Sequence, residues 1–299
     1  MSNGHTAPAA RLTGPAAAII PGGEFTVNGY SPERLPARRA SPVPQVQVHL
    51  LGPALITGAV SELQPKMGEL VYALALNTPP GLSGSALATM LGPDPDHAKP
   101  ADGLRQVITR TRRRLGTTPD GGEYITYRNG RYSLSGGWLD WNEFAILAVR
   151  GRDTGNRQAL RAALNLVRGQ PCDGIFFWWL EPAVIESMRA DVTDAAALLA
   201  RLELDAGDPA AAGRAARVGL AADPAAEHLW RAVMEAEYAV GNITGVHQAW
   251  RLLRAAIAAI SPGGQPHPDS VALYQDLTQP QSAAPSRVAP PQSSHQQPR

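Results

Sequence analysis

Residues 100–115 carry the side chains best suited to chemistry in this sequence, because they combine a dense run of arginines with a regular apolar spacing. Positions 103–119 contain five arginines and no acidic residue. Apolar or small side chains recur there at spacings of four, three and four, which predicts a helix with one inward face. The inward face consists of Leu104, Ile108, Thr111 and Leu115.

The opposite face of this predicted helix is polar and basic. It consists of Gln106, Thr109, Arg110 and Arg113, flanked by Arg105, Arg112 and Arg114. In a major groove, arginine pairs with guanine through two hydrogen bonds, and glutamine or threonine contacts bases or phosphates. The sequence therefore predicts a DNA-recognition helix, although a basic face that only meets solvent is an alternative.

A second candidate for DNA contact lies a short distance after this helix. Asn129-Gly130 separates two runs rich in aromatic and β-branched residues, 124–127 and 131–134, which is a strong signal for a β-hairpin. Arg128 and Arg131 flank the tip and are predicted to reach phosphates or the minor groove. A solvated hairpin tip is the alternative for these two residues.

Motifs typical of enzymes are missing from the sequence. It has no phosphate-binding glycine loop with lysine, no His-Glu-x-x-His, no nucleophile elbow and no cluster of histidines and carboxylates at metal spacing. The single cysteine, Cys172, has no adjacent histidine to activate it. We therefore expect neither an enzyme nor a cofactor or metal site. The net charge of +1 says little about partners.

The elements around the basic helix predict a winged helix-turn-helix over residues 45–136. Two short strands, near 46–50 and 54–57, open this region, and helical spacing follows at 66–77. A second helix starts at Ser83 and is ended by Gly92-Pro93, before the basic helix and the terminal hairpin.

From about residue 137 to 277 the sequence predicts an all-α domain. Strand signals disappear after Trp141, and alanine-rich helical periodicity takes over. Gly207-Asp208-Pro209 is echoed 34 residues later by Gly241-Asn242-Ile243, and Ala215 by Ala249. This spacing is the period of a tetratricopeptide-like helical hairpin. The predicted fold class is thus mainly α, a winged helix followed by tetratricopeptide-like helical repeats.

The two ends of the sequence, 1–44 and 278–299, are rich in proline and poor in large apolar side chains, so we expect them to be disordered. No stretch has the pattern of a signal peptide, and no run approaches the ~20 apolar residues that span a bilayer. With one cysteine there is no disulfide framework. These features predict a cytoplasmic protein.

Residues 176–180, Phe-Phe-Trp-Trp-Leu, form the densest aromatic cluster of the sequence. Rings bury large apolar areas, so we expect this cluster in the core or at a domain interface. A ligand pocket is the alternative.

At this level of detail the sequence resembles a known family, the actinobacterial antibiotic-regulatory (SARP-like) proteins. These join an OmpR-type winged helix to a bacterial transcriptional activator domain. The likeness covers residues 46–277 in order and spacing. It rests on Val48-His49-Leu50-Leu51-Gly52-Pro53, Lys66-Met67-Gly68-Glu69-Leu70, Leu104-Arg105 through Leu115-Gly116, Gly130-Arg131-Tyr132-Ser133-Leu134, Asp140 to Phe144, Arg168-Gly169, Glu227-His228-Leu229-Trp230-Arg231, Met234, Gly241 and Arg251-Leu252-Leu253. Trp179-Leu180-Glu181-Pro182 is similar to a subgroup found at the C-terminus of LysM-containing, membrane-anchored proteins.

The resemblance implies a transcriptional activator. It implies that the winged helix binds double-stranded promoter DNA and that the helical domain forms a homodimer or contacts RNA polymerase. Two departures stand out: Thr111 replaces a usual leucine, and Met90-Leu91-Gly92-Pro93 replaces an acidic-Trp-Pro ending. Two alternatives stay open. One is a protein-interaction module whose winged helix does not bind DNA, and the other is the soluble part of a membrane-anchored LysM-type protein.

Overall fold

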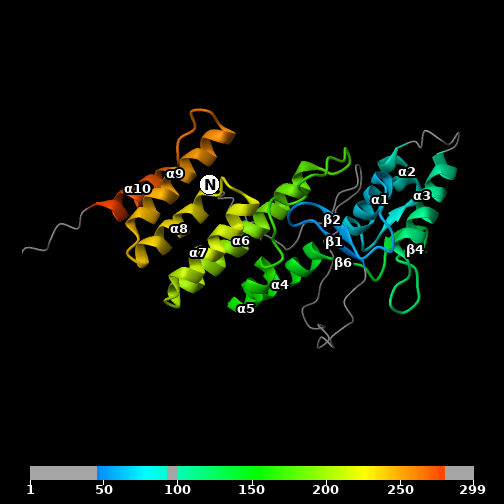
Figure 1. Cartoon of the computed structure of the whole chain (residues 1–299), viewed down its shortest axis with the longest axis horizontal. Helices are drawn as coiled ribbons and strands as arrows, with labels where there is room; N and C mark the ends of the chain where they lie inside the picture. Colours follow the sequence, from blue (N-terminus) through cyan, green and yellow to red (C-terminus); the bar gives the residue numbers. More distant parts are fainter. Residues whose placement is uncertain (1–45, 93–99, 280–299) are drawn as a thin grey trace, which may run out of the picture.

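The computed structural model describes residues 46–92 and 100–279, with side chains from residue 103 in the second range. The described part is elongated: a small α/β domain forms one end, and successive helices lead to α10 (Pro268–Thr278) at the other (Figure 1). The expected disordered leader lies outside the described residues. So does the expected tail beyond residue 279.

The N-terminal domain has the predicted winged-helix order of short strands, three helices and a hairpin. Its elements are β1 (Gln47–His49), β2 (Leu55–Thr57), α1 (Pro65–Leu76), β3 (Leu82–Ser83), α2 (Gly84–Leu91), α3 (Pro100–Leu115), β4 (Ile125–Arg128), β5 (Arg131–Leu134) and β6 (Trp138–Leu139). The strands form two three-stranded sheets, ordered β2-β1-β6 and β3-β5-β4. The two-residue strands β3 and β6 were not predicted, since two residues are too few to show a period.

The strand β6 pairs in parallel with β1 and leads directly into the first helix of the second domain. The second domain is all-α, as predicted. Its helices are α4 (Asp140–Thr154), α5 (Arg157–Leu164), α6 (Pro182–Asp205), α7 (Pro209–Ala222), α8 (Glu227–Ala239), α9 (Ile243–Ile260) and α10. Consecutive helices pack as the hairpins α4/α5, α6/α7 and α8/α9, and α10 covers α8 and α9.

The three hairpins share one turn. A glycine with positive φ ends the first helix, and the next residue caps the second helix with its side-chain oxygen. The glycine and cap pairs are Gly155 and Asn156, Gly207 and Asp208, and Gly241 and Asn242. The repeat predicted from Gly207 and Gly241 is therefore a structural repeat. The first hairpin escaped the sequence search because a long α5–α6 connection places it 52 residues earlier, outside the 34-residue period.

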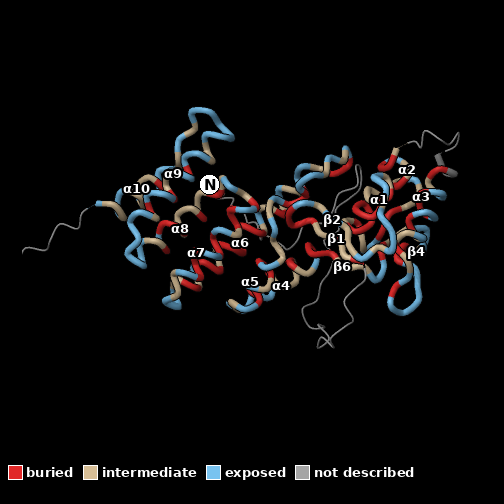
Figure 2. Tube along the Cα trace, viewed as in Figure 1, coloured by how far each residue is buried: buried red, intermediate tan, exposed pale blue. Residues whose placement is uncertain are grey.

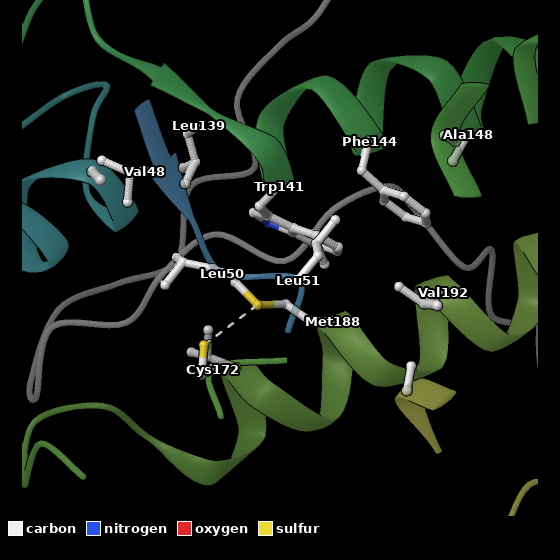
Figure 3. Packing of buried hydrophobic residues seen from close by; sticks show 14 of the residues in the cluster. Val48, Leu50, Leu51, Leu139, Trp141, Phe144, Ala148, Cys172, Met188 and Val192 are labelled. Atoms are coloured by element: carbon white, nitrogen blue, oxygen red, sulfur yellow. Dashed lines mark hydrogen bonds between the residues drawn. The ribbon is translucent and has the colours of Figure 1, made fainter. Parts of the chain in front are cut away.

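The two domains share buried side chains rather than meeting across a polar surface. Residues of and after β1, such as Leu50 and Leu51, pack with Trp141 of α4 and Met188 of α6 (Figure 3). The carboxylate of Asp140, at the start of α4, is buried and accepts the backbone N–H groups of Leu50 and Leu51 at 2.8 and 3.0 Å. The first helix of the second domain is thereby attached to the first strand of the winged helix.

Candidate nucleic-acid interface

The inward face of α3 is built as the sequence predicts. Ile108 and Leu115 are buried, and Leu104 packs partly against the core. Thr111 is fully buried, and its Oγ1 donates to the carbonyl of Val107 at 2.7 Å. Because this hydroxyl is paired within its own helix, the threonine is accommodated without an unsatisfied polar group.

The outward face of α3, which we define as Arg105, Gln106, Thr109, Arg110 and Arg113, is exposed to solvent. Its polar contacts are local: Arg110 Nη2 donates to Gln106 Oε1 at 3.0 Å, and Thr109 Oγ1 donates to the Arg105 carbonyl at 2.8 Å. Arginines in the last turn also complement the negative end of the helix dipole. The face thus presents guanidinium groups and an amide to any partner that approaches.

The two flanking arginines are tied to other parts of the domain. Arg112 Nε donates to the carbonyl of Ile125 in β4 at 2.9 Å and lies 3.2 Å from the Glu123 carboxylate. Arg114 Nη1 donates to the Glu62 carbonyl at 2.7 Å. These bonds fix α3 against the hairpin and against the loop before α1, so both side chains have a structural role whatever else they contact.

The predicted hairpin is present. Asn129 and Gly130 have φ values of 52° and 76°, the positive values that a two-residue type I′ turn requires. Arg128 and Arg131 are paired across the strands. Arg128 is exposed, whereas Arg131 Nη1 donates to the Gly81 carbonyl at 3.0 Å and so is partly engaged within the domain.

The structure adds a residue that sequence reasoning missed at this hairpin. The ring of Tyr127 is 57% exposed and packs on Tyr132 across the strands, with centroids 4.6 Å apart. Strand alternation places Tyr127 on the same side of β4 as buried Ile125. Its position next to the hairpin tip was the signal for exposure, because the tip extends beyond the core.

All these side chains belong to one end of the molecule. The helix α3 and strand β4 lie together at the end opposite α10 (Figure 1), and both contain exposed residues (Figure 2). The recognition-helix and hairpin candidates therefore belong to neighbouring elements at the same end of the molecule.

The aromatic segment, residues 176–180, lies at a domain contact, one of the two places that the sequence predicted, but only part of it is buried. Trp179 and Leu180 are buried, but Phe176 is 95% exposed and Trp178 is 65% exposed. The segment lies in the α5–α6 connection against the winged helix, where only alternate rings find apolar neighbours. It is thus a domain contact with two rings left in solvent.

Cys172 is buried, and desolvation raises the pKa of its thiol to about 12. A neutral, buried thiol is a poor nucleophile. Among the side chains that the structure describes, no group of three or more histidines, cysteines and carboxylates could hold a metal ion. In the same described residues, no helix combines the length and the apolar character needed to cross a membrane.

Comparison with known proteins supports this architecture. Residues 142–277 match the family described as the bacterial transcriptional activator domain. Among solved structures, the chain is similar to "Mycobacterium tuberculosis EmbR in complex with low affinity phosphopeptide", with a TM-score of 0.58 and 22% sequence identity. The similarity covers 78% of this chain and 65% of that one, and at this identity it shows the fold alone. No curated protein matches the chain.

Proposed function

Because the chain is SARP-like, with a winged helix before a bacterial transcriptional activator domain, we propose that it is a transcriptional regulator that binds double-stranded promoter DNA. The likeness to LysM-containing relatives is a narrower prediction, and the comparisons do not bear on it. The proposal divides into DNA contact by the winged helix and protein contact by the helical domain.

The observation that carries the proposal is the outward face of α3. Within the described residues, none of Arg105, Arg110 and Arg113 takes part in an ion pair. Three guanidinium groups on one solvated face attract phosphates, and an arginine paired with a neutral glutamine can exchange that partner for a base edge. In this proposal Arg110 and Gln106 read bases, while Arg105, Thr109 and Arg113 contact bases or backbone.

The hairpin extends the proposed interface. Arg128, exposed beside the tip, would contact phosphates or the minor groove. Arg112 and Arg131 also belong to the proposed interface. Each donates one hydrogen bond to a backbone carbonyl within the domain, so each positions the interface as well as contributing charge.

The helical domain offers surface for protein contact. Several large apolar side chains on α8, on α9 and in the turn between them are exposed, and we take them as candidate contact residues. They are Tyr238, Val240, Ile243, Leu252 and Ile260. We propose that this domain supports a homodimer or contacts RNA polymerase, that the regulator is an activator acting in the cytoplasm, and that it carries no enzymatic activity.

A gel-shift titration at low salt, with promoter fragments from the source genome and random duplex DNA of equal length, tests the proposal. We expect binding to both and tighter binding to some promoters. Failure to bind either DNA would reject the proposal and favour a protein-interaction module. An in-frame membrane segment upstream in the genome would favour the membrane-anchored alternative.

A further inference from the structure

The α5–α6 connection attaches the helical domain to the winged helix by its backbone. Cys172 donates its N–H to the carbonyl of Leu50 at 2.7 Å, and Ala54 donates to the carbonyl of Asp173 at 2.8 Å. This part of the connection pairs with the β1–β2 turn through an isolated parallel bridge between Pro53 and Asp173. The aromatic segment follows it immediately.

The aromatic segment then makes two hydrogen bonds from indole groups to two helices of the winged helix. Trp178 Nε1 donates to the carbonyl of Met90 in α2 at 2.9 Å, and Trp179 Nε1 donates to Glu69 Oε1 in α1 at 2.8 Å. The preceding ring, Phe177, stacks on Trp179 with centroids 5.1 Å apart, and its centroid lies 6.0 Å from that of Tyr72 in α1.

The Met90 carbonyl is one of the last four of α2, which have no partner within the helix. The same end of α2 packs on α3: Ala88 and Leu91 line a small cavity together with Leu104 and Val107. A group that holds the end of α2 therefore also constrains the placement of α3. The indole N–H of Trp178, 88 residues later in the sequence than Met90, is such a group.

We propose that Trp178 and Trp179 are positioning residues through which the helical domain fixes α1 and α2, and with them the recognition helix α3. The inference rests on the proposed function for its link to DNA affinity. Trp178 gives the clearer test, because its ring is 65% exposed and so contributes mainly through its N–H rather than through burial.

Two variants and a control test this role. Trp178→Phe keeps an aromatic ring but removes the donor, and Glu69→Ala removes the acceptor of Trp179 without disturbing its buried ring. Phe176→Leu changes the neighbouring exposed ring, for which the structure records no hydrogen bond among the described residues. Amide hydrogen exchange and the salt dependence of DNA affinity are measured on the full chain.

We expect Trp178→Phe to speed amide exchange in α2 and α3 by about two- to tenfold, the range for one lost hydrogen bond. DNA affinity should fall by a similar factor with an unchanged salt slope, since no phosphate contact is lost. Glu69→Ala should speed exchange in α1, and Phe176→Leu should match wild type. The melting temperature of Trp178→Phe should stay near that of wild type.

Amide exchange in α2 and α3 that is as slow in Trp178→Phe as in wild type would overturn the proposal. An equal increase of exchange in Phe176→Leu would also overturn it. A reduced salt slope for Trp178→Phe would also contradict it, since that result would make Trp178 a DNA contact. If wild type binds no DNA, the proposed function fails, while the exchange comparison still decides whether the indoles position α2.

Discussion

Arginines in the helical domain and arginines on α3 are used in different ways. In the helical domain, Arg157 and Arg161 of α5 converge on the buried carboxylate of Glu203 in α6, at 3.0 and 2.6 Å. On α3, Arg110 donates to the neutral side chain of Gln106 and forms no ion pair with any residue that the structure describes. The first arrangement ties two helices together within the fold, and the second leaves charge available to a partner.

The difference lies in where the acidic residues stand. In the helical domain, α6 supplies the Glu203 carboxylate to the two arginines of α5. Likewise, α8 supplies the Glu237 carboxylate to Arg217 of α7. Positions 103–119, which contain most of α3, hold no acidic residue. The fold therefore commits arginines such as Arg157 and Arg161 to a buried carboxylate, whereas Arg110 has a neutral partner.

The largest expected effect concerns burial rather than charge, within the aromatic segment. Trp179→Ala should lower the free energy of unfolding by about 3 to 5 kcal/mol, because it removes a buried ring from the domain contact. Phe176→Ala should change it by less than about 0.5 kcal/mol, as expected for an exposed site. Urea denaturation of both variants checks this. Equal stabilities would mean that Trp179 is not core.

Glu203→Ala tests whether the ion pairs of Arg157 and Arg161 stabilise the helical domain. We expect a loss of about 2 to 3 kcal/mol in the free energy of unfolding, the scale of buried hydrogen bonds to charged groups. The loss stays below that of a fully buried pair because Arg157 and Arg161 are 42% and 50% exposed and can return to water. DNA affinity of the folded variant should equal wild type. Reduced affinity without reduced stability would contradict the assignment.

Arg110→Ala tests whether the outward face of α3 reads bases. If Arg110 reads a base, binding to the preferred site weakens by about 1 to 3 kcal/mol, and preference relaxes at one base pair. Folding should be unaffected, since the side chain is exposed and opposite Ile108 and Leu115. Affinities for a set of single-base-pair variants of the site provide the measurement. A uniform loss across all of them would make Arg110 a backbone contact instead.

The smallest effect belongs to Arg113. Arg113→Ala should weaken binding to all sequences alike and reduce the slope of log affinity against log salt by about one, as expected for one lost phosphate contact. A salt titration with specific and random DNA measures the slope. An unchanged slope would place Arg113 outside the interface.

Much of the fold followed from local patterns. The two faces of α3 follow from its apolar spacing, and the type I′ hairpin follows from Asn129-Gly130, because these signals depend on neighbouring residues alone. The repeat of Gly207 and Gly241 was visible for the same reason: each glycine adopts a positive φ and precedes a capping side chain.

What escaped prediction depends on residues far apart in the sequence. The hydrogen bonds of Trp178 to α2 and of Trp179 to α1 join residues 88 and 110 positions apart, so no local pattern shows them. The engagement of Arg112 by Ile125 and Glu123 likewise requires the folded hairpin beside α3. The sequence shows which arginines lie on one helical face, but it does not show which of them bond to other parts of the domain.

The central claim is that DNA lies against the outward face of α3, and site-specific photo-crosslinking tests it most directly. A photoreactive amino acid is placed at Gln106 on that face or at Gln248, an exposed position on α9 in the helical domain. With duplex DNA at low salt, we predict crosslinks from position 106 and none from position 248. Absence of crosslinks from position 106, or equal yields from both positions, would contradict the account.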